Sequence, residues 1–276
     1  MSILPACLEA WPRWAWMWAL AFAIYAVCKV LTWAISPVRG APLARQWGYL
    51  LAWPGLDAAA FLDTRRPRAL APSGQEWLFA FAKLAFGITC FFGLARWVPA
   101  NQPYLAGWVG MVGLIFMLHF GSFHLLSCAW RMAGVNAQPL MDWPLAASSV
   151  SDYWGKRWNR AFRDFAYRFG FRPLTPRLGV AAATMVVFAF SGVVHDAVIS
   201  LPAGGGYGGP TLFFIVQGAG LFAERSSLGR KWGLGRGWRG RAFAMFVLLA
   251  PLVLLFHPPF VENIVVPMMK DCGALP

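Results

Sequence analysis

One histidine lies in a stretch of sequence that is otherwise apolar enough to cross a membrane. His195 follows Phe190-Ser-Gly-Val-Val and precedes Asp196. A charged side chain near the centre of a bilayer costs about 2.5–3.5 kcal/mol or more, so an ionisable residue there is a candidate functional group. A neutral imidazole, whose ordinary pKa is about 6.5, can act as a general base at neutral pH. We therefore expect the chemistry of this chain at His195.

A polar and aromatic segment lies upstream of this histidine and ends on an asparagine. Its sequence is Asp152-Tyr-Trp-Gly-Lys-Arg-Trp-Asn159. Trp154 and Trp158 are four residues apart, so they share a helix face and either line an acyl chain or pack in the core. Asn159 and His195 are the two residues from these segments that we expect to work together.

Basic side chains surround the asparagine. They are Lys156, Arg157, Arg160 and Arg163. Such groups pair well with phosphates, which suits a phosphorylated cosubstrate, but they also anchor helices to anionic lipids. The uncharged Asn159 favours the first interpretation, because lipid anchoring has no need of an amide. Ser148 and Ser149 are candidate helix caps, and aromatic residues at spacings of three and four predict a basic amphipathic interfacial helix after them.

Residues near the histidines refine these expectations. Ser191 and Gly192 lie one turn before His195, and such small residues let a helix or a substrate approach closely. Asp196 is adjacent to His195 and so points to another helix face, which argues against a direct pairing. His119 and His124 are five residues apart and do not share a face, so no metal site is expected.

The composition is that of an integral membrane protein. The chain has 276 residues, of which 59% are hydrophobic and 13% charged, and its mean hydropathy is +0.54. Soluble domains are about 45–50% apolar and about 25% charged. The net charge of +13 does not indicate nucleic-acid binding, because the basic residues cluster in loops between apolar segments. We expect one membrane-embedded domain over residues 1–276, in contact with membrane lipids.

Six apolar segments have about the 17–25 residues needed to cross the membrane. They lie near residues 14–35, 78–98, 104–130, 178–200, 210–224 and 242–266. They predict an all-α fold, a polytopic transmembrane helical bundle of about six spans with interfacial amphipathic helices. The apolar stretch 46–62 is interrupted by Pro54-Gly55, so we expect it to lie half-buried against the cytoplasmic side.

The distribution of basic residues predicts the orientation of the bundle. Nineteen of the 24 Lys and Arg residues fall in the loops 36–77, 131–177 and 225–241, and none falls in 99–103 or 201–209. Cytoplasmic loops are enriched in basic residues, so both termini are expected outside. Arginine-rich loops, short connections and the absence of Asn-x-Ser/Thr sequons favour a bacterial inner membrane.

Two motifs together resemble the membrane-bound O-acyltransferase superfamily. They are Ser151-Asp-Tyr-Trp-Gly-Lys-Arg-Trp-Asn159 and Phe190-Ser-Gly-Val-Val-His-Asp196. The similarity is greatest to its wax-synthase-like branch, where a DFWGRRWN-type segment precedes an SGxxHE-type helix. The stretch Tyr49-Leu-Leu-Ala-Trp-Pro-Gly-Leu-Asp57 is similar to an N-terminal element of that branch. Asp196 stands where the family often has Glu.

The resemblance implies acyl transfer from acyl-CoA to a hydroxyl, most often that of a lipophilic long-chain alcohol, in a tunnel within the membrane. His195 would then be the general base, and Asn159 would donate a hydrogen bond to the thioester carbonyl. Residues implied in substrate binding are Trp154, Lys156, Arg157, Trp158, Arg160 and Ser191. No metal or cofactor is implied beyond acyl-CoA as a cosubstrate.

Two alternatives stay open from the sequence. The first is an acyltransferase acting on a sterol, glycerolipid or polysaccharide hydroxyl. The second is a transporter or non-catalytic scaffold, although the inverted repeats expected of many transporters are not found in the sequence.

The depth of His195 leads to a geometric expectation. A straight helix starting at Leu178 would place His195 roughly 25 Å from the cytoplasmic end. We therefore expect Asn159 to be drawn into the bundle, or the helix to start later or to tilt. The two side chains should then line one cavity open to the cytoplasm, within about 10 Å of each other.

Overall fold

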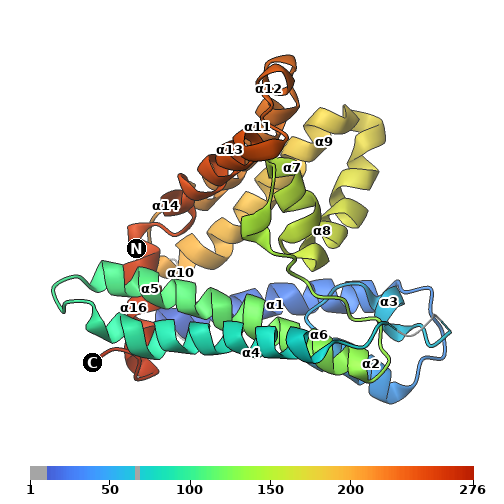
Figure 1. Ribbon diagram of the computed structural model, residues 1–276, viewed down its shortest axis with the longest axis horizontal. Helices are drawn as coiled ribbons and strands as arrows, with labels where there is room; N and C mark the ends of the chain where they lie inside the picture. Colours follow the sequence, from blue (N-terminus) through green and yellow to red (C-terminus); the bar gives the residue numbers. More distant parts are fainter. Residues whose placement is uncertain (1–10, 66–68) are drawn as a thin grey trace.

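The computed structural model describes residues 11–65 and 69–276, and within these ranges every regular element is a helix (Figure 1). The all-α fold expected from the sequence is confirmed. Five helices in the described ranges are long and apolar enough to cross a membrane. They are Arg13–Ala34, Gly74–Trp97, Pro103–Met132, Arg160–Ala203 and Gly237–Leu255.

The elements follow one another along the chain in three groups. The first group is α1 (Arg13–Ala34), α2 (Leu43–Ala52), α3 (Ala58–Leu62), α4 (Gly74–Ile88), η2 (Thr89–Gly93), η3 (Leu94–Trp97), α5 (Pro103–Ile115), η4 (Phe116–Ser122) and α6 (Phe123–Met132). The second is η5 (Pro144–Ala146), α7 (Val150–Asp152), η6 (Tyr153–Arg157), α8 (Arg160–Ala166), η7 (Tyr167–Phe171), α9 (Arg172–His195), η8 (Asp196–Ser200) and α10 (Leu201–Ala203). The third is α11 (Gly209–Arg225), α12 (Ser227–Trp232), α13 (Gly237–Leu249), α14 (Leu252–Leu255), α15 (Pro258–Phe260), η9 (Val261–Val265) and α16 (Val266–Asp271). Of the η elements, η3 and η5 are 3-10 helices and the others are π-helical turns.

The last two of the six expected spans differ from the observed helices. The segment 210–224 forms α11, which has 17 residues and is shorter than the five long helices. The segment 242–266 does not run through, because the helix ends at Leu255 and the chain turns at His257, which starts α15 with two prolines. Proline cannot continue a helix from the preceding turn. The residues beyond form η9 and α16, whose apolar side chains are buried against α5 and α1.

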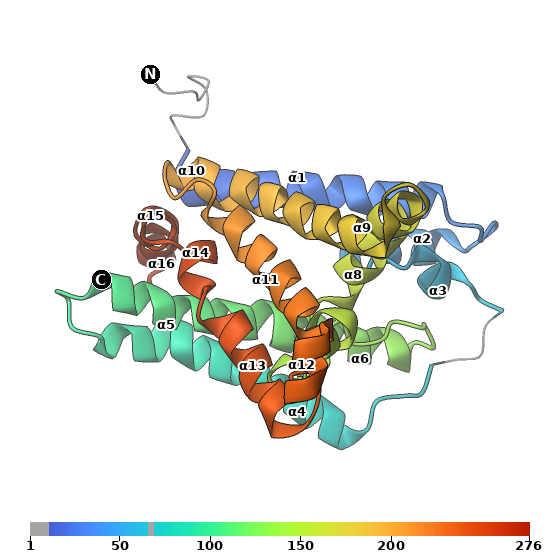
Figure 2. The ribbon, with the colours of Figure 1, turned by 90° about the horizontal axis from the view of Figure 1, so that it is seen from above.

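The ends of the helices separate the basic loops from the short connections. In Figure 1 the turn between η3 and α5, the α10 turn and α16 lie at the left of the molecule, whereas α2, α3 and α12 lie toward the right and the top. The helices therefore alternate in direction, which agrees with the alternating topology expected from the basic residues. Seen from above, α11 crosses between α9 and α13 (Figure 2).

Small residues set the closest helix contacts. A Cβ at Gly192 of α9 would lie 2.5 Å from the Thr211 Cα of α11. A Cβ at Gly87 of α4 would lie 2.7 Å from the Gly113 carbonyl oxygen of α5. Glycine lets helices in a bilayer approach until their backbones touch, so dispersion contacts replace the missing hydrophobic drive. The expectation that the small residues before His195 admit a neighbouring helix is thus met by α11.

A buried lysine fixes the broken segment near the N-terminus. The segment 46–62 forms parts of α2 and α3 around an extended turn, and the Nζ of Lys29 donates to the Trp53 carbonyl oxygen at 2.7 Å and also to that of Gly55. The same ammonium lies 3.4 Å from the centre of the Tyr49 ring. Carbonyls and aromatic faces both attract a cation, so Lys29 holds this turn against α1.

Candidate active site

His195 is held in one orientation at the end of α9. Its Nδ1 lies 2.6 Å from the Ser191 carbonyl oxygen, and its ring centre lies 4.5 Å from that of Phe214 on α11. A carbonyl only accepts hydrogen bonds, so Nδ1 carries the hydrogen. In the neutral imidazole the lone pair is then on Nε2, which is the nitrogen able to take a proton.

Asp196 makes its hydrogen bonds to the start of α11. Its carboxylate accepts from the backbone N–H groups of Gly208 and Thr211, each at 2.9 Å, and from the Ser200 hydroxyl at 2.8 Å. It also accepts from the Thr211 hydroxyl. A carboxylate at a helix N-terminus satisfies N–H groups that have no partner within the helix. Asp196 therefore ties the end of α9 to α11.

The same network continues to the C-terminal part of the chain. The backbone N–H of Phe260 donates to His257 Nδ1 at 3.2 Å, so the hydrogen of the neutral ring is on Nε2. Nε2 then donates to the Ser200 hydroxyl at 3.0 Å, and Ser200 donates to Asp196. Burial lowers the pKa of His257, which favours this neutral form. The relay is fully used for structure, and it fixes the corner next to His195.

The segment upstream of Asn159 is a short helix that ends before the asparagine. Ser149 caps it by accepting from the Asp152 N–H at 2.9 Å, as expected. Burial would raise the pKa of Asp152, but hydrogen bonds from the Ser148 N–H and from Arg157 outweigh it and hold that pKa below its usual range. The carboxylate therefore stays charged and pins Arg157.

The continuous amphipathic helix expected across this segment is wrong. The chain is extended at Trp158 and left-handed at Asn159, whose φ is 39°. Asparagine is among the few residues that adopt this conformation at low cost. The Asn159 side-chain oxygen then accepts from the Phe162 N–H at 3.3 Å and caps α8. Among the hydrogen bonds of the described residues, none joins Asn159 to His195.

Trp158 lies against the middle of a long helix. Its ring stacks on His119 of η4 at 6.0 Å and 21° between planes, and on Tyr153 at 5.7 Å and 10°. His119 lies well inside the membrane-spanning helix Pro103–Met132. The residue next to Asn159 is thus drawn into the bundle, which is the first of the options that the depth of His195 required.

Trp154 connects this segment to the histidine of α9. Its ring centre lies 5.7 Å from that of Phe214 and 5.7 Å from that of Phe188, and its Nε1 donates to the Gln217 side-chain oxygen at 3.4 Å. Phe214 is also the ring that His195 contacts. Trp154 and His195 therefore share one aromatic neighbour. Phe214 and the fully buried Gln217 were not expected from the sequence, because both read there as ordinary residues of an apolar span.

The helix that carries His195 is not straight. Gly179 has φ 74° and ψ 167° and interrupts α9, so the straight part begins after Leu178. Glycine adopts this conformation without the steric cost of a Cβ. The late start of this helix that the depth argument allowed is therefore found. The distance of about 10 Å between Asn159 and His195 and a shared cavity stay predictions.

The basic residues near Asn159 differ in their availability. Arg157 is bonded to Asp152 and to the Asp142 carbonyl oxygen. Arg163 pairs with Asp164 and donates to the Gly155 carbonyl oxygen. Lys156 is exposed and Arg160 is half-buried.

A second group of basic residues, which the sequence indicated only as a sign of topology, lines a cavity of about 370 Å³. Its lining residues are Glu224, Arg225, Arg230, Gly233, Gly235 and Arg236. Glu224 is buried and accepts from the Val150 N–H at 2.6 Å, so the cavity adjoins the start of α7.

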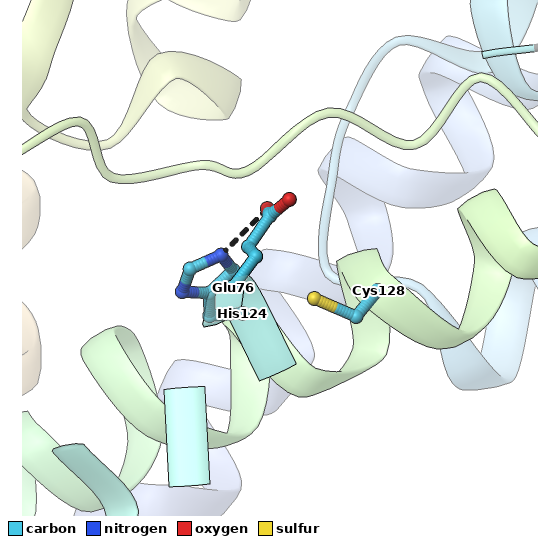
Figure 3. A group of neighbouring side chains, drawn as sticks. All are labelled: Glu76, His124 and Cys128. Atoms are coloured by element: carbon cyan, nitrogen blue, oxygen red, sulfur yellow. Dashed lines mark hydrogen bonds and ion pairs between the residues drawn. The ribbon is translucent and has the colours of Figure 1, made fainter. Parts of the chain in front are cut away.

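Glu76, His124 and Cys128 form a cluster with the composition of a metal site (Figure 3). Lys83 Nζ lies 2.6 Å from His124 Nδ1. An ammonium only donates, so Nδ1 is the acceptor and Nε2–H donates to Glu76 at 3.0 Å. Arg131 also pairs with Glu76, and two cations beside one carboxylate repel a metal ion. The cluster joins α4 to α6 by charge.

Comparison with known proteins agrees with these features. Residues 137–216 match the model of the membrane bound O-acyl transferase family, and the chain is a member of that family. It is a multi-pass integral membrane protein. The matched range contains both the segment ending at Asn159 and the helix that carries His195.

Two relatives carry more specific names. The chain is 26% identical to a long-chain-alcohol O-fatty-acyltransferase of Simmondsia chinensis over 48% of this chain and 40% of that protein. It is 28% identical to a probable long-chain-alcohol O-fatty-acyltransferase 7 of Arabidopsis thaliana over 36% of this chain and 33% of that protein. The matches thus span less than half the length of these curated relatives.

Proposed function

We propose that this protein transfers a fatty acyl group from acyl-CoA to the hydroxyl of a long-chain alcohol and so forms a wax ester. The observation that carries the proposal is the hydrogen bond from His195 Nδ1 to the Ser191 carbonyl oxygen, at 2.6 Å. It leaves Nε2 as the proton acceptor on a ring held against Phe214. An oriented imidazole of this kind is what a general base requires.

In the proposed reaction, His195 Nε2 takes the proton of the alcohol while the alcohol oxygen attacks the thioester carbonyl carbon. The carbonyl oxygen becomes an oxyanion, and its charge is stabilised by donors placed beforehand. The carbon–sulfur bond then breaks, the ester is released, and the proton on His195 passes to the CoA sulfur. Atoms and charge balance without a metal or a redox partner.

Asn159 is the proposed oxyanion donor. Its side-chain oxygen caps α8, so its NH2 group is the part of the amide that is able to donate. The left-handed backbone and the cap hold the amide in one position, which supports a role that depends on preorganisation.

We propose that the two substrates approach from different directions. Phosphates of acyl-CoA suit the cytoplasmic end, where Lys156 is exposed and three arginines line the adjoining cavity. The acyl chain and the alcohol suit the apolar environment of Trp154 and Phe214. The names of the two distant relatives support the long-chain alcohol as the acceptor.

The test is ester formation by the purified protein in detergent or proteoliposomes, with radiolabelled palmitoyl-CoA and hexadecanol. The parent protein should form ester, and His195→Ala should lower the rate by about 10²- to 10⁴-fold, the usual contribution of a general base. Thr184→Ala is the matched control, because this α9 hydroxyl donates within its own helix, to the Val180 carbonyl oxygen. It should retain the parent rate.

Three results would contradict the proposal. Full activity of a folded His195→Ala variant would remove the base. Transfer to a sterol, diacylglycerol or polysaccharide with none to hexadecanol would change the acceptor. Uptake of a solute by proteoliposomes without thioester turnover would indicate a transporter.

A further inference from the structure

His119 differs from the other three histidines in its hydrogen bonding. His124, His195 and His257 each have a ring nitrogen bonded to a protein group. His119 Nδ1 is buried and has no hydrogen-bond partner among the described residues. A buried polar atom without a partner loses its hydration and gains nothing in return. Its partner is therefore expected to come from outside the protein.

The surroundings of His119 are aromatic and lie deep in the bundle. The ring stacks on Trp158, and its centre lies 5.3 Å from that of Phe123. It belongs to η4, a π-helical turn within an otherwise α-helical span. Such turns cost stability and occur frequently at functional sites. Neither the stacking nor the backbone geometry requires a nitrogen at this position.

A series of touching rings links His119 to the proposed base. From His119 it runs through Trp158, Tyr153, Trp154 and Phe214 to His195. The two imidazoles contact different ends of this series. His119 is next to the residue that precedes Asn159, whereas His195 is on Phe214.

The chemistry of the two substrates separates their claims on the two histidines. A long-chain alcohol has one polar group, and that hydroxyl must be at His195 to react. An acyl-CoA carries two amides in its pantetheine arm besides the thioester, and these must enter a region where water is scarce. A second imidazole away from His195 therefore suits the donor substrate.

We propose that His119 binds the pantetheine–thioester end of the acyl donor by a hydrogen bond from or to Nδ1. This proposal rests on the proposed function and adds a substrate-binding residue to it. His119 is retained for binding, because a phenylalanine would make the same ring contacts without an unpartnered nitrogen.

The test is His119→Phe, compared with the parent by two measurements that do not depend on each other. Equilibrium binding of a non-reactive thioether analogue of palmitoyl-CoA should weaken about tenfold, the value of one hydrogen bond. The KM for hexadecanol should stay within about twofold, because the alcohol does not use His119. The thermal unfolding temperature should be equal or higher, since an unsatisfied polar atom has been removed.

His124→Phe is the control for a structural histidine. It loses the bonds to Lys83 and Glu76, so it should unfold at a lower temperature than the parent. His119→Gln keeps a donor and an acceptor, and it should recover part of the analogue binding.

Several outcomes would overturn the proposal. They are unchanged binding of the analogue by His119→Phe, no binding by the parent, a change confined to the KM for the alcohol, and a loss of stability equal to that of His124→Phe. Failure of the proposed function is separate, because it is the absence of ester formation by a parent protein that still binds the analogue.

Discussion

Substitution of Gly192 by alanine tests the contact that positions the proposed base. The new Cβ would lie 2.5 Å from the Thr211 Cα and 3.1 Å from the Thr211 carbonyl oxygen. Ordinary van der Waals contacts of a Cβ are 3.4–4 Å. The obstacle is backbone and cannot rotate away, so α9 and α11 must separate by about 1 Å in a core where overpacking is poorly tolerated.

The expected loss of stability follows from two opposing effects. Overpacking of this kind costs typically 1–3 kcal/mol, and the higher helix propensity of alanine offsets about 1 kcal/mol of it. The free energy of unfolding should therefore fall by about 1–2 kcal/mol, most of it from the clash with the Thr211 backbone.

The activity should fall further than the stability does. Phe214 lies one turn beyond Thr211 on the displaced helix and holds the His195 ring, so a shift of about 1 Å acts directly on the base. Misplacement by about 1 Å can lower a rate by about 10²-fold. The assay is ester formation well below the unfolding temperature, where the variant is still folded.

Gly74→Ala is the matched control, because a Cβ at that position meets nothing within 4 Å. It should behave as the parent does. If Gly192→Ala unfolds at the same temperature and reacts at the same rate as Gly74→Ala, then α9 and α11 are not packed as described, and the reasoning is refuted.

Two further predictions concern the segment that ends at Asn159. Glu224→Gln weakens the charge-assisted bonds to the Val150 and Ser151 N–H groups, so hydrogen exchange at these two amides should accelerate and the KM for acyl-CoA should rise; unchanged exchange would contradict this. Asp152 has a lowered pKa in the folded protein, so its ionised form contributes stability above about pH 3.9 that is lost as the pH falls through the folded-state pKa. The unfolding temperature of the parent should therefore drop more steeply below about pH 4 than that of Asp152→Asn, and equal slopes for the two proteins would remove the pairing with Arg157.

Much of the bundle was predictable because hydrophobic length and charge act over short stretches. The apolar windows located the long helices, and the basic loops located their cytoplasmic ends. Ser149 as a cap and the broken segment around Pro54 were also readable, since both depend on neighbouring residues alone. The motifs containing Asn159 and His195 pointed to the family for the same local reason.

The break at Trp158 could not be read from the helical spacing of the aromatic residues. The periodicity of that stretch is amphipathic, but Trp158 gains more by stacking on His119 and Tyr153 than by continuing the helix. The chain leaves the helix at Trp158, and Asn159 tolerates the left-handed turn that follows. A contact between elements thus overrode a local pattern.

The sequence by itself determined that the chain is a helical membrane protein, which loops are basic, and that His195 and Asn159 belong to one family signature. It did so because burial in lipid and motif chemistry depend on residue type and spacing. Only the tertiary structure decided which nitrogen of His195 is free, that Asp196 holds α11, and that His119 lies unpartnered against Trp158. These properties are set by hydrogen bonds and ring contacts, most of them between residues far apart in the chain, and no local pattern encodes such distances.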